Sequence, residues 1–190
     1  MKRALPVCVL LAGALCGPVL GEKQPALEDT RAIYALNLFG AACMANLGDA
    51  DRISAWAGLE ALAPLDPGEV ALLLAGKPGH GWNASGPNGE ALLLLGEDGV
   101  CSVWARRAAA AQTQAWVRAM MQQAGADGTR AELVEDRLLD GRGGQYRLVA
   151  FRLSSTGSPR QFLLSCATTE ADNEQVAAQL MLSVGEIRPR

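Results

Sequence analysis

The feature that most constrains the fold is a pair of apolar segments separated by a short, glycine-bounded connection. Residues 90–95 contain four consecutive leucines, residues 100–105 follow them, and Gly-Glu-Asp-Gly lies between the two segments. Such a pair predicts two antiparallel strands joined as a hairpin. Alternation along the second strand puts Cys101 and Val103 on one face and Trp104 on the other. The chain is therefore expected to build an antiparallel sheet.

Three later segments also have the composition of strands. Residues 131–139, 145–154 and 161–168 are rich in apolar side chains, and turn residues occupy positions 140–144 and 155–159. The first of the three carries many charges, which suits the edge of a sheet. Together with the hairpin, these segments predict a sheet of about five strands.

Apolar residues spaced three and four positions apart predict helices around these strands. The first three helical segments start at residues whose side-chain oxygen can cap the free N–H groups of a helix. The candidates are Asp29 or Thr30 for the first segment, Asp49 or Asp51 for the second and Asp66 for the third. A buried strand over residues 70–75 is the alternative for the third segment. The expected helices cover residues 30–47, about 50–63, 67–75, 108–123 and 172–184.

The predicted order of elements is ααα-ββ-α-βββ-α, which is typical of the α+β class. Residues 76–89 are rich in Gly, Pro, Asn and Ser and predict a loop before the hairpin. No internal repeat or long linker interrupts residues 22–190, and this length suits one domain with a hydrophobic core. We expect a single α+β domain with an antiparallel sheet packed by helices.

The N-terminus has the pattern of an export signal. Lys2 and Arg3 precede an apolar segment over residues 4–20, and small or modest side chains before Glu22 suit cleavage after Gly21. This pattern predicts a periplasmic or secreted protein with residues 1–21 removed and no transmembrane span left after signal removal.

Two alternatives to a cleaved signal remain open. A membrane anchor would need about 20 apolar residues, and this segment is short and contains two prolines. Lipidation at Cys16 would need a small residue before the cysteine, and Leu15 is not small. Both alternatives still direct the chain to the cell envelope.

The charge balance excludes two classes of partner. The whole chain has 17 basic and 20 acidic residues, and removal of Lys2 and Arg3 with the leader changes the net charge from −3 to −5. Nucleic acid binding and adhesion to anionic lipid both require a basic surface. We therefore expect no nucleic acid partner.

Three cysteines remain after the leader is removed: Cys43, Cys101 and Cys166. An oxidising compartment allows one disulfide among them and leaves one thiol. We expect the bridge Cys43–Cys101, which would tie the first helix to the hairpin. A bridge between Cys101 and Cys166 is an alternative, because both face inward on strands, and three reduced thiols are another. With one histidine in the chain, we expect no zinc site and no other metal or cofactor.

The only histidine, His80, lies in the glycine-rich segment. With a free thiol it could form a Cys/His nucleophile, which would make the chain an envelope hydrolase. No local signature of a thiol hydrolase, no Gly-x-Ser-x-Gly motif and no phosphate-binding glycine pattern accompanies it. The sequence therefore favours a protein without enzymatic activity.

The glycine-rich segment could instead form a surface that contacts a partner. Trp82 either packs into the core or stands ready as an anchor for a partner. Arg106 and Arg107 follow the second strand of the hairpin and can flank such an anchor. The predicted binding surface comprises His80, Trp82, Arg106 and Arg107.

Several short motifs occur together in this chain. They are the signal, Cys43 in an early helix, Trp56-Ala57, Leu74-Ala75-Gly76 leading to Gly81-Trp82, Gly99-Val100-Cys101-Ser102-Val103 and Ala105-Arg106-Arg107-Ala108. In these motifs the chain resembles a family of small uncharacterised exported proteins and lipoproteins of Gram-negative bacteria. The resemblance implies an envelope location, no established activity and no catalytic residue. The chain differs at Cys166, where such proteins are expected to have serine or threonine, and this supports the bridge Cys43–Cys101.

These observations favour a periplasmic protein that binds another macromolecule, an unidentified envelope or secreted protein. One version is an immunity-type protein that neutralises an exported toxin, by analogy with other small acidic exported proteins. An envelope hydrolase using His80 is the second hypothesis. The third is a carrier of a small apolar ligand, held in a cavity lined by Leu92, Leu94, Trp116 and Phe151.

Overall fold

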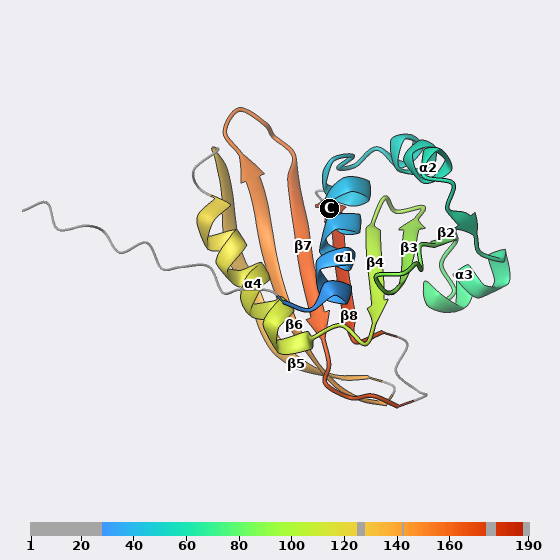
Figure 1. The fold of residues 1–190 in the computed structure, drawn as a ribbon. Helices are drawn as coiled ribbons and strands as arrows, with labels where there is room; N and C mark the ends of the chain where they lie inside the picture. Colours follow the sequence, from blue (N-terminus) through green and yellow to red (C-terminus); the bar gives the residue numbers. More distant parts are fainter. Residues whose placement is uncertain (1–27, 125–127, 142, 174–177, 188–190) are drawn as a thin grey trace, which may run out of the picture.

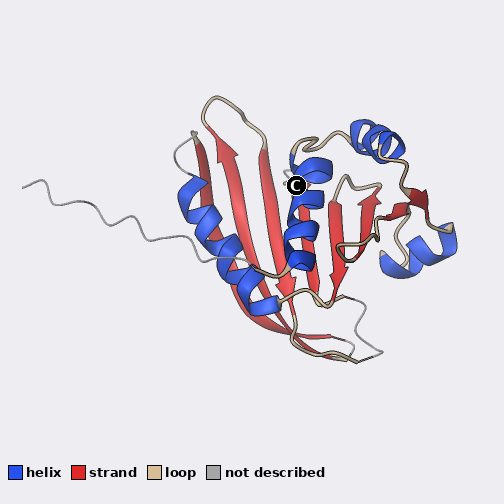
Figure 2. Cartoon of the chain, in the orientation of Figure 1, coloured by secondary structure: helices blue, strands red, loops and turns tan. Residues whose placement is uncertain are grey.

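The computed structural model describes residues 28–124, 128–141, 143–173 and 178–187, which form an antiparallel sheet packed by helices (Figures 1 and 2). Within these residues the sheet has eight strands in the order β1-β2-β3-β4-β8-β7-β6-β5. The predicted α+β class is confirmed, but the prediction of about five strands is too low. The strands are β1 (Ala63–Pro64), β2 (Gly79–Asn83), β3 (Glu90–Gly96), β4 (Cys101–Arg106), β5 (Thr129–Gly141), β6 (Gly144–Ser155), β7 (Gln161–Thr168) and β8 (Leu180–Glu186).

Most of the helical structure covers one face of the sheet, which we call the helical face and which carries Cys101 and Val103. Helix α1 packs against β4 and β8, and α4 packs against β7 (Figure 1). Helix α3 lies on the opposite face, beneath β2. The helices are α1 (Thr30–Phe39), the π-helix η1 (Gly40–Met44), α2 (Ala50–Leu59), α3 (Pro67–Leu73) and α4 (Ala110–Gln123).

Asp29, Asp49 and Asp66 are the N-caps among the predicted candidates, and Thr30 and Asp51 lie within α1 and α2 instead. Asp29, Asp49 and Asp66 each have extended backbone geometry, and each side chain accepts a hydrogen bond from a backbone N–H in the first turn of its helix. These bonds satisfy donors that the helix itself cannot pair. The first helix continues beyond α1 as η1, where the N–H of Ala45 bonds to the carbonyl of Gly40, five residues earlier.

The loop predicted over residues 76–89 is wrong in part, because β2 lies within it. The glycines of this strand allow close packing rather than a turn. A Cβ on Gly81 would lie 2.8 Å from the Val70 side chain, closer than real Cβ contacts allow, and 3.1 Å from that of Leu94, which is a tight contact. Gly81 therefore lets α3 pack closely against the sheet. A glycine-rich segment can form a strand where such close packing is needed, although it lacks the β-branched side chains that are typical of strands.

The last predicted helix, residues 172–184, is also wrong. Residues 180–186 form β8, which pairs with β4 on one side and β7 on the other. Leu180, Leu182 and Val184 are buried on the helical face. Leu180 and Val184 are four residues apart, a spacing that fits both one side of a helix and one face of a strand. The segment forms a strand because it pairs with a neighbouring strand on each side. The expected inner residues Val176 and Ala177 lie outside the described residues.

The disulfide Cys43–Cys101 is confirmed and joins η1 to β4 through the core. The Cα atoms of the two cysteines are 5.5 Å apart, and both side chains are buried. It closes a loop of 58 residues, which in the chain-entropy model stabilises the fold by about 4 kcal/mol. Cys166 is a free, buried thiol on β7.

Candidate functional site

Two residues of the predicted binding surface lie together on β2. His80 and Trp82 have ring centroids 6.1 Å apart, and both belong to the helical face because Trp82 pairs with Leu93 and Leu93 with Val103. His80 is exposed, whereas Trp82 is half-buried and packs against the core. Trp82 thus contributes mainly to the core and keeps only part of its ring for contact.

The two arginines lie elsewhere. Arg106 pairs with Glu90 at the end of β4, and strand alternation puts its side chain on the face opposite to Trp82. Arg107 lies beyond the strand, in the link to α4, and is exposed. The structure therefore does not bring the four predicted residues together as one surface.

His80 and the free thiol are far apart. Cys166 is four strands away from β2 in the sheet, or about 19 Å at the usual spacing between strands. Burial raises the pKa of the Cys166 thiol to about 12, against a smaller opposing effect of Arg118. A thiolate at this position is therefore scarce at neutral pH, and His80 cannot reach its proton.

The residues proposed for an apolar ligand do not face one another either. Leu92 and Leu94 lie on the face of β3 that also carries Trp104, whereas Phe151 lies on the helical face of β6. Trp116 packs against the core on the helical face as well. These side chains therefore do not line one cavity.

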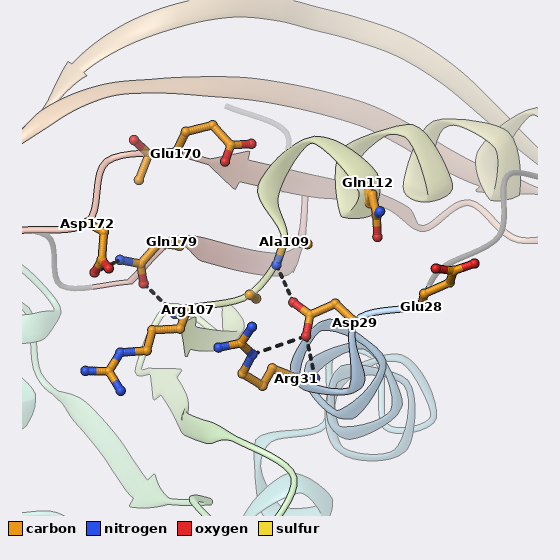
Figure 3. Close-up of a pocket in the computed structure, with 11 residues that line it drawn as sticks. Glu28, Asp29, Arg31, Arg107, Ala109, Gln112, Glu170, Asp172 and Gln179 are labelled. Atoms are coloured by element: carbon orange, nitrogen blue, oxygen red, sulfur yellow. Dashed lines mark hydrogen bonds and ion pairs between the residues drawn. The ribbon is translucent and has the colours of Figure 1, made fainter.

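Arg107 is one of the residues that line a polar cavity of about 600 Å³ (Figure 3). The cavity lies where the start of α1, the link from β4 to α4 and the link from β7 to β8 meet. Charged and amide side chains dominate its lining, so we call it the polar cavity. The lining residues are Glu28, Asp29, Arg31, Arg107, Ala108, Ala109, Gln112, Thr169, Glu170, Asp172 and Gln179.

Asp29 connects two helices at the floor of the polar cavity. Its Oδ1 accepts hydrogen bonds from the backbone N–H and the Nε of Arg31, both at 3.1 Å, within α1. Its Oδ2 accepts a 2.6 Å hydrogen bond from the N–H of Ala109, which precedes α4 (Figure 3). Burial by itself raises the pKa of Asp29, but these bonds outweigh it and hold the pKa below the ordinary value of 3.8.

A second carboxylate supports the start of α4. Glu170 accepts a hydrogen bond from the N–H of Ala111 at 3.0 Å. The residue at the N-cap position, Ala109, has no side-chain oxygen with which to cap the helix. Carboxylates from two distant segments therefore replace a local cap, and the sequence around α4 carries no signal of this.

Gln179 holds the wall of the polar cavity in place. Its side chain is 4% exposed, and its Oε1 accepts a 2.7 Å hydrogen bond from the N–H of Arg107. Its Nε2 donates to the carbonyl of Ala171 and to Asp172. This amide joins the link before α4 to the link before β8. Sequence reasoning placed Gln179 inside a helix and so missed this role.

Arg107 has a backbone conformation that residues other than glycine rarely adopt. Its φ is +57°, in the left-handed region, which costs a residue other than glycine about 1–2 kcal/mol. Within the described part of the chain its guanidinium has no hydrogen-bond or ion-pair partner, and it extends away from Asp29 in Figure 3. The arrangement thus holds an unpaired cation, with five N–H donors, at the rim of the cavity.

Neither a metal site nor a membrane-spanning helix occurs in the part of the chain that the structure describes. These residues contain no group of three His, Cys, Asp or Glu side chains placed to hold a metal ion. None of the described helices has the length and apolar character needed to cross a membrane.

Comparison of the chain with protein-family profiles, curated proteins and solved structures gives no match.

Proposed function

We propose that the chain is an exported envelope protein that acts by binding another protein through the polar cavity. The observation that carries this proposal is the unpaired guanidinium of Arg107 on a rigid wall. Its backbone N–H is held by the buried amide of Gln179, so little backbone entropy would be lost at this position when a partner binds. A contact residue whose backbone is held in place in advance is typical of binding sites.

The chemistry of the lining supports binding rather than catalysis. The described lining residues provide charges, amides and a threonine hydroxyl, with no histidine, cysteine or serine among them. The most buried carboxylate, Asp29, is occupied by three hydrogen bonds that hold two helices. These groups suit recognition of polar main chain and charged side chains.

The disulfide and the leader support the location. Cys43–Cys101 is a buried bridge of a kind that persists in oxidising compartments. The first 21 residues have the pattern of a cleaved export signal. We expect the protein from a periplasmic fraction to have the mass of residues 22–190, and a protein that keeps residues 1–21 in the cytoplasm would contradict this part of the proposal.

The binding proposal is tested by comparing two arginine variants. The tagged protein, cross-linked in cells and purified from the envelope, should carry one partner that mass spectrometry identifies. In Arg107→Gln the yield of that partner should fall at least about fivefold, as expected for loss of a charged contact of about 1 kcal/mol. Arg106→Gln is the matched control, because it removes the same charge from the opposite face of the sheet. Equal yields from the two variants would rule out the polar cavity as the binding site.

A further inference from the structure

A second cavity, of about 400 Å³, adjoins the polar cavity. The two share Thr169 and Glu170 in their linings. The second cavity lies between the first turn of α4 and the hairpin of β5 and β6, and alanine and leucine side chains make up much of its wall. We call it the apolar cavity. Its lining residues are Ala110, Ala111, Gln114, Leu138, Gln145, Arg147, Thr168, Thr169, Glu170 and Ala171.

We infer that the two cavities form one bipartite site for a peptide segment in which a lysine or arginine stands next to an apolar residue. This inference rests on the proposed function and names the chemistry of the partner segment. Each cavity has a volume typical of sites that hold a small group, about 300–1,000 Å³. The shared residues make the two cavities continuous, so adjacent side chains of one segment can enter both.

The polar cavity selects a cation. Asp29 and Arg31 form an ion pair with each other and so present little net charge to a ligand. The other cation of the lining is Arg107 at the rim. Among the described lining residues, three further carboxylates therefore outnumber the one remaining guanidinium, and the cavity is negative overall. These carboxylates are Glu28, Glu170 and Asp172.

The hydrogen bonds leave acceptor capacity for such a ligand. Glu170 uses Oε1 for the N–H of Ala111, and Asp172 uses Oδ1 for the amide of Gln179. An ionised carboxylate has about four acceptor sites on its two oxygens, so both can accept from a lysine or arginine as well. Arg107 can donate to the main-chain carbonyl oxygens of the same segment. A peptide thus satisfies both signs of charge in the polar cavity.

The apolar cavity selects the neighbouring side chain. Leu138 on β5 is 59% exposed although it forms part of the wall, so an apolar side chain that covers it would bury surface from water. Leu133 on the same strand is 50% exposed and points to the same face, but it lies outside the cavity. The two leucines therefore provide a matched pair for an experiment.

The test measures binding of dye-labelled pentapeptides to the mature full-length protein by fluorescence anisotropy. The probe has lysine followed by leucine between glycines. One comparison peptide has glutamate in place of lysine, and another has serine in place of leucine. We expect the probe to bind at least about fivefold more tightly than either, because a charge contact and a buried leucine each contribute about 1 kcal/mol or more.

Variants of the protein assign each half of the probe to its cavity. Glu170→Gln keeps an acceptor for Ala111 and removes the charge, so it should weaken binding of the lysine probe about threefold. The affinity of the variant for the glutamate peptide should not fall. Leu138→Ser should weaken the probe about fivefold, whereas Leu133→Ser should not change its affinity. Equal binding of all three peptides, or equal effects of the two leucine variants, would overturn the inference.

Failure of this inference is distinguishable from failure of the proposed function. If Arg107→Gln loses the cellular partner but the peptides bind equally, the cavity binds a partner of different chemistry and only the inference fails. If Arg107→Gln keeps the partner, the proposed function fails whatever the peptides do.

Discussion

Asp29 and Ala109 are 80 residues apart in the chain, and the carboxylate of the first accepts a 2.6 Å hydrogen bond from the backbone N–H of the second. The same carboxylate caps α1 through the N–H of Arg31. One side chain thus fixes the starts of two helices that pack on the same face of the sheet. Asp29 and Ala109 both line the polar cavity (Figure 3).

Asp29→Ala should destabilise the protein more than loss of an ordinary cap. The variant leaves N–H groups at two helix starts without an acceptor, and we expect a loss of about 2 kcal/mol in the free energy of unfolding, measured with urea. Asp49→Ala is the matched control because Asp49 caps α2 alone, through the N–H of Arg52. It should cost about 1 kcal/mol. Equal losses in the two variants would mean that the bond to Ala109 contributes nothing.

The part of the Asp29 contribution that depends on its negative charge should be lost in acid. Its folded pKa lies below the ordinary value of 3.8, so folding favours the ionised form. The stabilisation is complete above the unfolded pKa and is lost as the pH falls through the folded pKa. The stability difference between wild type and Asp29→Ala should therefore be constant near neutral pH and shrink as the pH falls below the ordinary value of 3.8. A difference that stays constant down to pH 2 would show that the charge of Asp29 has no role.

The disulfide gives a prediction by thiol counting. The mature exported protein, denatured without reductant, should have one reactive thiol, that of Cys166, and three after reduction. Cys101→Ser should lower the free energy of unfolding by about 4 kcal/mol in the chain-entropy model. Cys166→Ala should have no reactive thiol before reduction and should keep the bridge. Three reactive thiols in the oxidised wild type would contradict the bridge.

Replacement by alanine should change stability in opposite directions at Gly81, where α3 packs closely on β2, and at Gly58, where space is open. In Gly81→Ala the new methyl group would lie 2.8 Å from the Val70 side chain, so either this side chain or α3 must shift, and we expect a loss of about 1–3 kcal/mol in stability. Gly58 lies within α2, and no atom of its surroundings lies within 4 Å of the place that a methyl group would take, so Gly58→Ala should stabilise by up to about 1 kcal/mol. Urea unfolding of both variants checks this, and a neutral Gly81→Ala would show that the packing can relax.

The elements that were predicted correctly have local causes. The caps of Asp29, Asp49 and Asp66 act on the next residues of the chain, and the hairpin of β3 and β4 follows from a tight connection between apolar runs. Interactions of this kind, between residues close in the chain, can be predicted from a single sequence.

The elements that were missed depend on distant partners. Strand β2 is specified by the fit of Gly81 against Val70, and β8 by the two strands between which it lies. The polar cavity could not be predicted for the same reason. Its floor and wall depend on Asp29 and on Gln179, whose contacts with Ala109 and Arg107 span 80 and 72 residues. Arg107 was singled out from the sequence, but without its conformation or its surroundings.

Arg107→Gly should separate stability from binding. Glycine adopts φ near +57° without the steric cost of a side chain, so the variant should be as stable as wild type or more stable by up to about 1 kcal/mol, and the bond from its N–H to Gln179 is kept. It should nevertheless lose the cellular partner as Arg107→Gln does. Arg106→Gly is the control, because a glycine within β4 should destabilise the strand by about 0.5–1 kcal/mol and leave the partner bound. If Arg107→Gly is stable and keeps the partner, the Arg107 side chain does not bind the partner, and binding does not explain why an arginine occupies this left-handed position. Loss of the partner from a stabilised variant would show that the strain at Arg107 persists because the side chain is used.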